Sequence, residues 1–77
     1  MEYVINNIMI KNKCYITIEL YNGDWQRLTY MCYNVPEMHI KNVHSVLIDT
    51  LSCEKENTLD RWDMLIHTCI DKTLGYR

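Results

Sequence analysis

The chain begins with three stretches in which apolar and polar residues alternate with the two-residue period of a β-strand. Residues 3–10, 14–21 and 25–33 follow this pattern, and short turn-forming segments separate them. After Asn34 the period changes to that of an amphipathic helix. We therefore expect an α+β fold in a single small domain, residues 1–77: a three-stranded antiparallel β-meander followed by two α-helices packed on one face (βββαα).

The two expected helices have recognisable ends. Asn34 can cap the first helix, Glu37 follows three residues later as in a capping box, and apolar residues recur at helical spacing over residues 40–51. The second helix is expected to begin near residues 57–58 and to stop at Gly75, because glycine readily adopts the left-handed conformation that ends many helices.

The register of the sheet depends on the cross-strand pairs that each turn would create. A two-residue loop at Asn22-Gly23 gives poorly matched pairs, whereas a three-residue loop at 22–24 gives pairs of like character. Such pairs stabilise a sheet by roughly 0.2–1 kcal/mol each, which favours the second register. A three-residue loop at 11–13 is predicted in the same way. The predicted pairs are Cys14 with Cys32, Ile16 with Tyr30, Ile18 with Leu28, Thr17 with Thr29, Glu19 with Arg27, Tyr21 with Trp25, Ile10 with Cys14, Ile8 with Ile16 and Val4 with Leu20.

This register divides the strand residues between two faces. The predicted inward face is mainly aliphatic and consists of Val4, Ile8, Ile10, Cys14, Ile16, Ile18, Leu20, Leu28 and Tyr30. The predicted outward face is rich in the Tyr, Trp, Met and Arg that are enriched at protein interfaces, although Tyr and Trp are also simply good strand formers. Besides Ile5, Met9, Thr17 and Glu19, it carries the residues that we predict to bind a partner: Tyr3, Tyr15, Tyr21, Trp25, Arg27, Met31 and Tyr33.

The charge balance argues against a general nucleic-acid-binding protein. Eight Lys and Arg residues stand against ten Asp and Glu residues, a net charge of −2, whereas binding to phosphates needs clustered positive charge. Aromatic side chains on a sheet can stack on bases, so a small dimeric nucleic-acid-binding regulator using Lys11, Lys13 and Arg27 is the alternative. Loss of affinity with added salt would distinguish it.

The residues that often bind metals show no closed site in this sequence. Cys14, Cys32, Cys53 and Cys69 include no C-x-x-C pair, so we expect reduced thiols that pack in the core. Asp63, His67 and Asp71 follow one another at four-residue spacing, where one ion reaches only two of them. A solvated helix face explains this stripe, and we expect no metal.

Neither catalysis nor a membrane is indicated. His39 and His44 are five residues apart and share no helical face, and no nucleophile, base and orienting group come together in the sequence. We expect no enzymatic activity and no cofactor. The N-terminal residues do not resemble a signal peptide and no run is long enough to span a membrane, so a cytoplasmic protein is expected.

These observations predict a small protein-binding module, an inhibitor, antagonist or adaptor that acts on a larger host protein or complex through its aromatic sheet face. The same face could instead join two copies in a homodimer. By analogy alone, small proteins of this kind are often encoded by phages and other mobile elements, among them inhibitors of host defence systems that act in the host cytoplasm.

Overall fold

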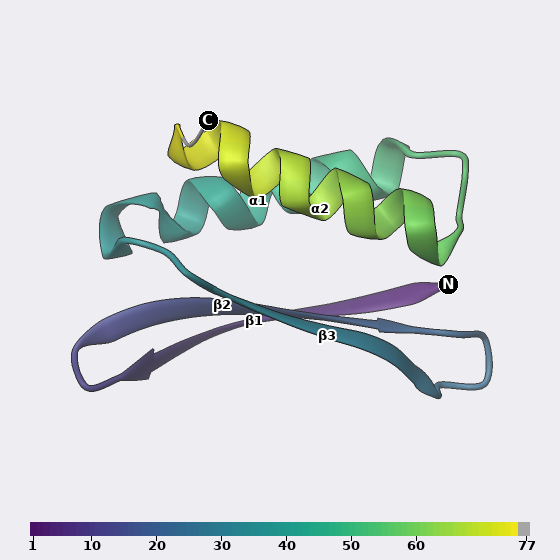
Figure 1. The fold of residues 1–77 in the computed structure, drawn as a ribbon, viewed down its shortest axis with the longest axis horizontal. Coiled ribbons are helices and arrows are strands. Elements are labelled where there is room, and N and C mark those ends of the chain that lie inside the picture. Colours follow the sequence, from purple (N-terminus) through teal and green to yellow (C-terminus); the bar gives the residue numbers. More distant parts are fainter. Residues whose placement is uncertain (76–77) are drawn as a thin grey trace. The chain divides into compact units, whose positions relative to one another are not determined.

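The computed structural model describes residues 1–75, which fall into two compact units, one of residues 1–40 and one that begins at Lys41. Figure 1 shows the order of the elements along the chain, which confirms the α+β class and the βββαα order. The elements are β1 (Glu2–Ile10), β2 (Lys13–Tyr21), β3 (Arg27–Asn34), the 3-10 turn η1 (Glu37–His39), α1 (Ile40–Cys53) and α2 (Leu59–Leu74).

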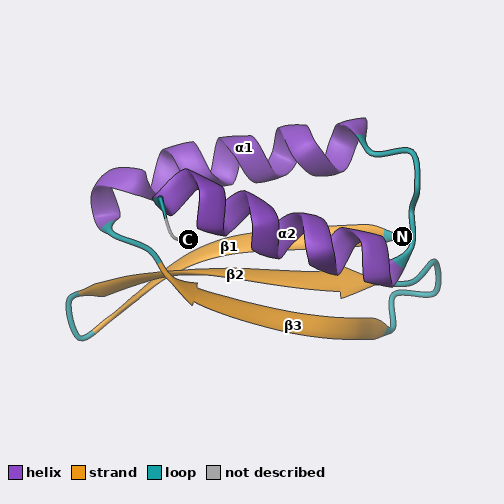
Figure 2. Cartoon of the chain, turned by 45° about the horizontal axis from the view of Figure 1, so that its top comes forward, coloured by secondary structure: helices purple, strands orange, loops and turns teal. Residues whose placement is uncertain are grey.

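The first unit is an antiparallel sheet with β2 between β1 and β3 (Figure 2). The alternation along β2 is as predicted, because Ile16, Ile18 and Leu20 have no solvent exposure. Thr17, between them in sequence, is also buried, and its hydroxyl donates a hydrogen bond of 3.4 Å to the carbonyl oxygen of Asn6 in β1.

The predicted register between β1 and β2 is wrong by one residue. Ile10 pairs with Lys13 instead of Cys14, and the turn between the strands consists of Lys11 and Asn12 alone. Both turn residues have positive φ, 50° and 66°, as a two-residue turn of type I′ requires. Lys-Asn lacks the glycine that usually marks this turn, but asparagine tolerates the left-handed region, and the tight turn matches the twist of the strands.

The predicted register between β2 and β3 is wrong by three residues. Thr17 pairs with Cys32 instead of Thr29, and a β-bulge follows the pair of Leu20 with Thr29, so that Tyr21 pairs with Arg27. The loop therefore spans the five residues 22–26, and the predicted three-residue loop at 22–24 does not form. Backbone hydrogen bonds to the Asn22 side chain stabilise this longer loop and outweigh the preference for a short one.

Both shifts are odd numbers of residues, and therefore β1 and residues 29–34 of β3 turn their side chains to the opposite faces from those predicted. Arg27 keeps its predicted face because the bulge precedes its pair with Tyr21. The Ile18 face, named here for the buried residue at its centre, carries Tyr3, Ile5, Asn7, Met9, Cys14, Ile16, Ile18, Leu20, Thr29, Met31 and Tyr33. The Tyr21 face, on the other side of the sheet, carries Glu2, Val4, Asn6, Ile8, Ile10, Lys13, Tyr15, Thr17, Glu19, Tyr21, Arg27, Tyr30, Cys32 and Asn34.

The first helix begins later than predicted. Asn34 pairs with Tyr15 as the last residue of β3 and does not cap a helix, and Pro36 is extended, with ψ of 139°. The turn η1 follows without a side-chain cap before α1 begins at Ile40. The predicted cap is wrong because Asn34 pairs with Tyr15, which extends β3 through the residue that was expected to begin the helix.

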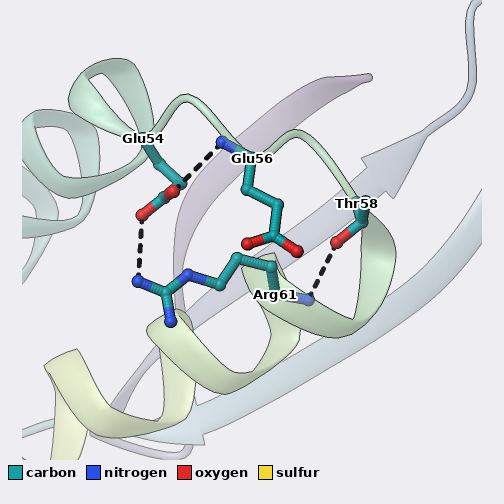
Figure 3. Close-up of polar contacts among 4 residues, drawn as sticks. All are labelled: Glu54, Glu56, Thr58 and Arg61. Carbon is teal, nitrogen blue, oxygen red and sulfur yellow. Dashed lines mark hydrogen bonds and ion pairs between the residues drawn. The ribbon is translucent and has the colours of Figure 1, made fainter.

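The second helix has the predicted ends. Thr58 caps α2 by accepting a hydrogen bond of 3.3 Å from the Arg61 amide, and Gly75, with φ of 78°, closes its C-terminus. Figure 3 shows how the segment before the helix is held: the Glu54 carboxylate accepts one bond from the Glu56 amide and pairs with the Arg61 guanidinium at 3.3 Å. These contacts join Glu54, the first residue after α1, to the first turn of α2.

Buried residues recur at helical spacing in both helices of the second unit, as the sequence predicts. The helices run side by side in Figures 1 and 2. Their buried residues are Val43, Leu47 and Leu51 of α1 and Trp62, Ile66, Cys69 and Ile70 of α2.

Candidate protein-binding surface

The loop between β2 and β3 is organised by Asn22. The Asn22 carbonyl oxygen accepts a bond of 3.0 Å from the Trp25 amide, and the Asn22 amide donates to the Gln26 carbonyl oxygen at 3.1 Å. The side-chain oxygen of Asn22 accepts two more bonds, from the amides of Asp24 (2.9 Å) and Gln26 (3.0 Å). One residue therefore fixes the path of the loop through four backbone contacts.

Trp25 lies in this loop with an unusual backbone conformation. Its φ is 60°, in the left-handed region, which costs a residue with a Cβ roughly 1–2 kcal/mol. The residue is 61% exposed, and the centroid of its ring lies 5.5 Å from that of the Tyr21 ring, with the planes tilted by 49°. The loop thus holds a large aromatic side chain at the surface in a strained backbone conformation.

The residues of β2 and β3 beside the loop form a connected polar and aromatic group. The Tyr21 hydroxyl donates a hydrogen bond to the Glu19 carboxylate, and the Arg27 guanidinium lies 3.8 Å from the same carboxylate. Arg27 also lies over the ring of Tyr30, 5.6 Å from its centroid, in cation–π geometry. We call Glu19, Tyr21, Trp25, Arg27 and Tyr30 the Trp25 cluster.

The charges of the Trp25 cluster are unequally accessible. The Glu19 side chain is 19% exposed, whereas that of Arg27 is 57% exposed and Tyr30 is 49% exposed. The hydrogen bond to Glu19, followed by partial burial and the carboxylate charge, raises the pKa of Tyr21 above its ordinary value, so that its hydroxyl remains a donor to Glu19. The cluster therefore presents a guanidinium and aromatic rings, while its carboxylate is engaged internally.

The predicted binding residues do not all share one face. Tyr15, Tyr21 and Arg27 lie on the Tyr21 face, and Trp25 lies in the adjoining loop. The other three, Tyr3, Met31 and Tyr33, lie on the Ile18 face, which corrects the predicted outward orientation. Met31 is only 9% exposed, and its sulfur accepts a hydrogen bond from the Tyr33 hydroxyl at 3.6 Å.

Tyr30 belongs to the surface although the sequence placed it in the core. It pairs with Glu19 on the Tyr21 face because the five-residue loop and the bulge set the register of β3. No short motif in the sequence specifies a bulge at this point. The only available indication was the suitability of Asn22 for side-chain-to-backbone hydrogen bonds in a turn.

The three cations of the nucleic-acid alternative are not brought together. Lys11 and Lys13 lie at the turn between β1 and β2, whereas Arg27 pairs with Tyr21 at the opposite end of β2. Tyr21 is eight residue positions after Lys13 along an extended strand, a distance of about 27 Å. A continuous basic track for a phosphate backbone is therefore absent from the sheet as described.

The cysteines are less buried than predicted. Cys69 is buried, as expected, but Cys14 is half-buried and both Cys32 and Cys53 are exposed. Cys14 pairs with Met9 and Cys32 with Thr17, so the predicted cross-strand pair of cysteines does not form. All four are free thiols.

The polar stripe of α2 provides one ion pair. The His67 ring nitrogen Nε2 lies 3.5 Å from the Asp63 carboxylate, and both side chains are about half exposed. Within residues 1–75 no group of three or more His, Cys, Asp or Glu side chains is arranged to hold a metal ion. A shallow groove between α1 and α2 is lined mainly by aliphatic and threonine side chains, together with Cys69 and Lys72, an arrangement without an acid–base pair.

In the described part of the chain, neither helix has the length and apolarity needed to cross a bilayer. No known protein family matches the sequence, and comparisons with curated proteins and with solved structures give no match.

Proposed function

We propose that this protein is a small non-enzymatic binding module that contacts a larger protein through the Trp25 cluster. The observation that carries the proposal is the conformation of Trp25: a residue that is 61% exposed and has φ of 60°, in a loop fixed by Asn22. A strained backbone that displays a bulky apolar side chain has no benefit for stability, and strain of this kind is typical of ligand-contacting sites.

The composition of the cluster supports a protein partner. Tryptophan, tyrosine and arginine dominate the energy of protein interfaces, and a ring that is already fixed loses little conformational entropy on binding. Arg27 is held by Glu19 and Tyr30, so its guanidinium is also fixed before contact. We infer a partner with an apolar pocket for the Trp25 ring and a carboxylate or backbone carbonyl for Arg27.

A module of this size without catalytic groups would act by occupying a surface of its partner. We therefore propose an inhibitor, antagonist or adaptor. The specific form that we favour is a protein that a phage or mobile element encodes to block a host defence complex. In that case the partner is a protein complex of the host cytoplasm.

The proposal is tested by quantitative affinity capture from the native host with three proteins: the wild type, Trp25→Ala and Met38→Ala. Met38 is 83% exposed and lies outside the Trp25 cluster, so it is a matched control for loss of an exposed apolar side chain. A true partner should be retained by the wild type and by Met38→Ala, and its affinity for Trp25→Ala, measured with the purified partner, should fall more than about tenfold.

Circular dichroism of each variant must show the wild-type fold for this comparison to count. If every protein captured by the wild type is captured equally by Trp25→Ala, the Trp25 cluster is not the binding surface and the proposal is wrong. If folded Met38→Ala loses the same partner, the contact involves the turn η1 and not the Trp25 cluster alone, which also contradicts the proposal.

A further inference from the structure

The strand β1 forms an edge of the sheet that lacks the usual protection against pairing with another strand. Its nine residues pair with β2 without interruption, and between Glu2 and Ile10 it has no proline, lysine, arginine or bulge. Natural edge strands usually carry such features because unpaired backbone groups bind other strands. The opposite edge has them, since β3 contains Arg27 and a bulge next to the pair of Leu20 with Thr29.

The second half of β1 is also exposed and apolar. Ile8 and Ile10 on the Tyr21 face are 38% and 51% exposed, and Met9 on the other side of the strand is 59% exposed. Both sides of this strand end therefore leave apolar surface in water. A strand added along the β1 edge would shield side chains on both faces at once.

The charges beside β1 identify its own copy as a suitable partner. Glu2 stands at the beginning of the strand, and Lys11 and Lys13 follow its end. In an antiparallel pair of identical strands, Glu2 of each copy meets the lysine end of the other. The opposite charges of Glu2 and of the lysines therefore favour this antiparallel pairing.

We propose that two copies of this protein associate through β1, antiparallel, with Asn6 opposite Asn6 of the second copy, so that the two three-stranded sheets become one. This symmetric register pairs the strands over their full length and joins like faces. It places Val4 opposite Ile8, Tyr3 opposite Met9, and Glu2 opposite Ile10, whose neighbour in β2 is Lys13. The carboxamides of the two Asn6 residues can exchange hydrogen bonds on the two-fold axis.

This dimer does not depend on the proposed function. The Trp25 cluster is formed by β2, β3 and the loop between them, away from the β1 edge. Trp25→Ala should therefore leave the association unchanged, and the two proposals can fail separately.

The test is analytical ultracentrifugation over a concentration series with charge variants at the two-fold axis. Wild type should form a dimer at high concentration, and Asn6→Lys and Asn6→Asp should each raise the dissociation constant about tenfold or more, because like charges would meet on the axis. An equimolar mixture of the two variants should restore dimers, since opposite charges then face each other. The matched controls are Asn34→Lys and Asn34→Asp, at an exposed asparagine on the β3 edge, which should associate like wild type.

Hydrogen exchange of the wild type gives an independent measurement that needs no variant. The outward amides of β1 should become protected as the dimer forms, while those of β3 should not change. A wild type that is monomeric at all concentrations overturns the proposal. So does a dimer that leaves β1 exchange unchanged, or a mixture of Asn6 variants that associates no better than either variant alone.

Discussion

The Trp25 amide donates a hydrogen bond of 3.0 Å to the carbonyl oxygen of Asn22, and this contact closes a loop in which Trp25 has φ of 60°. The left-handed conformation thus falls on the bulkiest residue of the loop, although Gly23 stands only two positions earlier. Glycine adopts this conformation without steric cost. The arrangement therefore favours display of the indole ring over stability of the loop.

The first prediction compares two substitutions that both remove this ring. Trp25→Gly and Trp25→Ala lose the same contact with Tyr21, but only glycine relieves the strain at φ of 60°. We expect Trp25→Gly to be more stable than Trp25→Ala by about 1 kcal/mol, measured by urea denaturation. Equal stabilities would show that position 25 carries no backbone strain.

The second prediction concerns Asn22. Asn22→Ala removes the side-chain oxygen that accepts hydrogen bonds from Asp24 and Gln26, and should destabilise the protein by about 1–3 kcal/mol. Asn22→Asp keeps an acceptor at this position and should cost less. Thermal melts of both variants measure the difference. If the two substitutions have the same effect, the acceptor bonds do not hold the loop.

The limits of prediction from this sequence lie in the turns. The alternation along β2 correctly placed Ile16, Ile18 and Leu20 in the core, because a central strand with one apolar side has only one favourable orientation. The ends of α2 were also correct, since Thr58 and Gly75 are local determinants that need no tertiary context. Element order, strand pairing order and the helical faces could all be obtained from such patterns.

The candidate surface was only partly predictable because the turns, which set the register of each edge strand, were predicted wrongly. Trp25 and Arg27 are exposed as predicted, and Tyr21 is half-buried on the predicted face. The turn at Lys11-Asn12 and the loop governed by Asn22, however, each changed a register by an odd number of residues. An odd shift exchanges the two faces of an edge strand. It therefore moved Tyr30 to the surface and Met31 to the interior, and no pattern in β3 alone distinguishes these orientations.

The third prediction tests that exchange directly. Met31 and Tyr30 are neighbours in β3, and Met31 is 9% exposed whereas Tyr30 is 49% exposed. Met31→Ala should cost about 2–5 kcal/mol of stability through lost packing, and Tyr30→Ala less than about 1 kcal/mol. Chemical denaturation of the two variants gives both values. If Tyr30→Ala is instead the more destabilising substitution, β3 has the orientation that was expected from the sequence.

The last prediction concerns pH and the connection between the helices. The hydrogen bond from the Glu56 amide, with the Arg61 guanidinium as a further cause, holds the pKa of Glu54 below its ordinary value of 4.5. A carboxyl group whose pKa is lowered by folding binds its proton more tightly in the unfolded chain. Its contribution to stability is therefore fully present above the unfolded pKa and is lost as the pH falls through the folded pKa.

We expect Glu54→Gln to remove this part of the acid sensitivity. The variant should be less stable than wild type near neutral pH, and the difference in melting temperature should shrink as the pH falls below about 4.5, because wild type then loses the same charge. Glu37→Gln is the matched control, since Glu37 is an exposed glutamate in the 3-10 turn before α1. Melts of the three proteins across this range provide the measurement. A Glu54→Gln difference that stays constant with pH would mean that shape and not charge accounts for the contacts of Glu54 with Glu56 and Arg61.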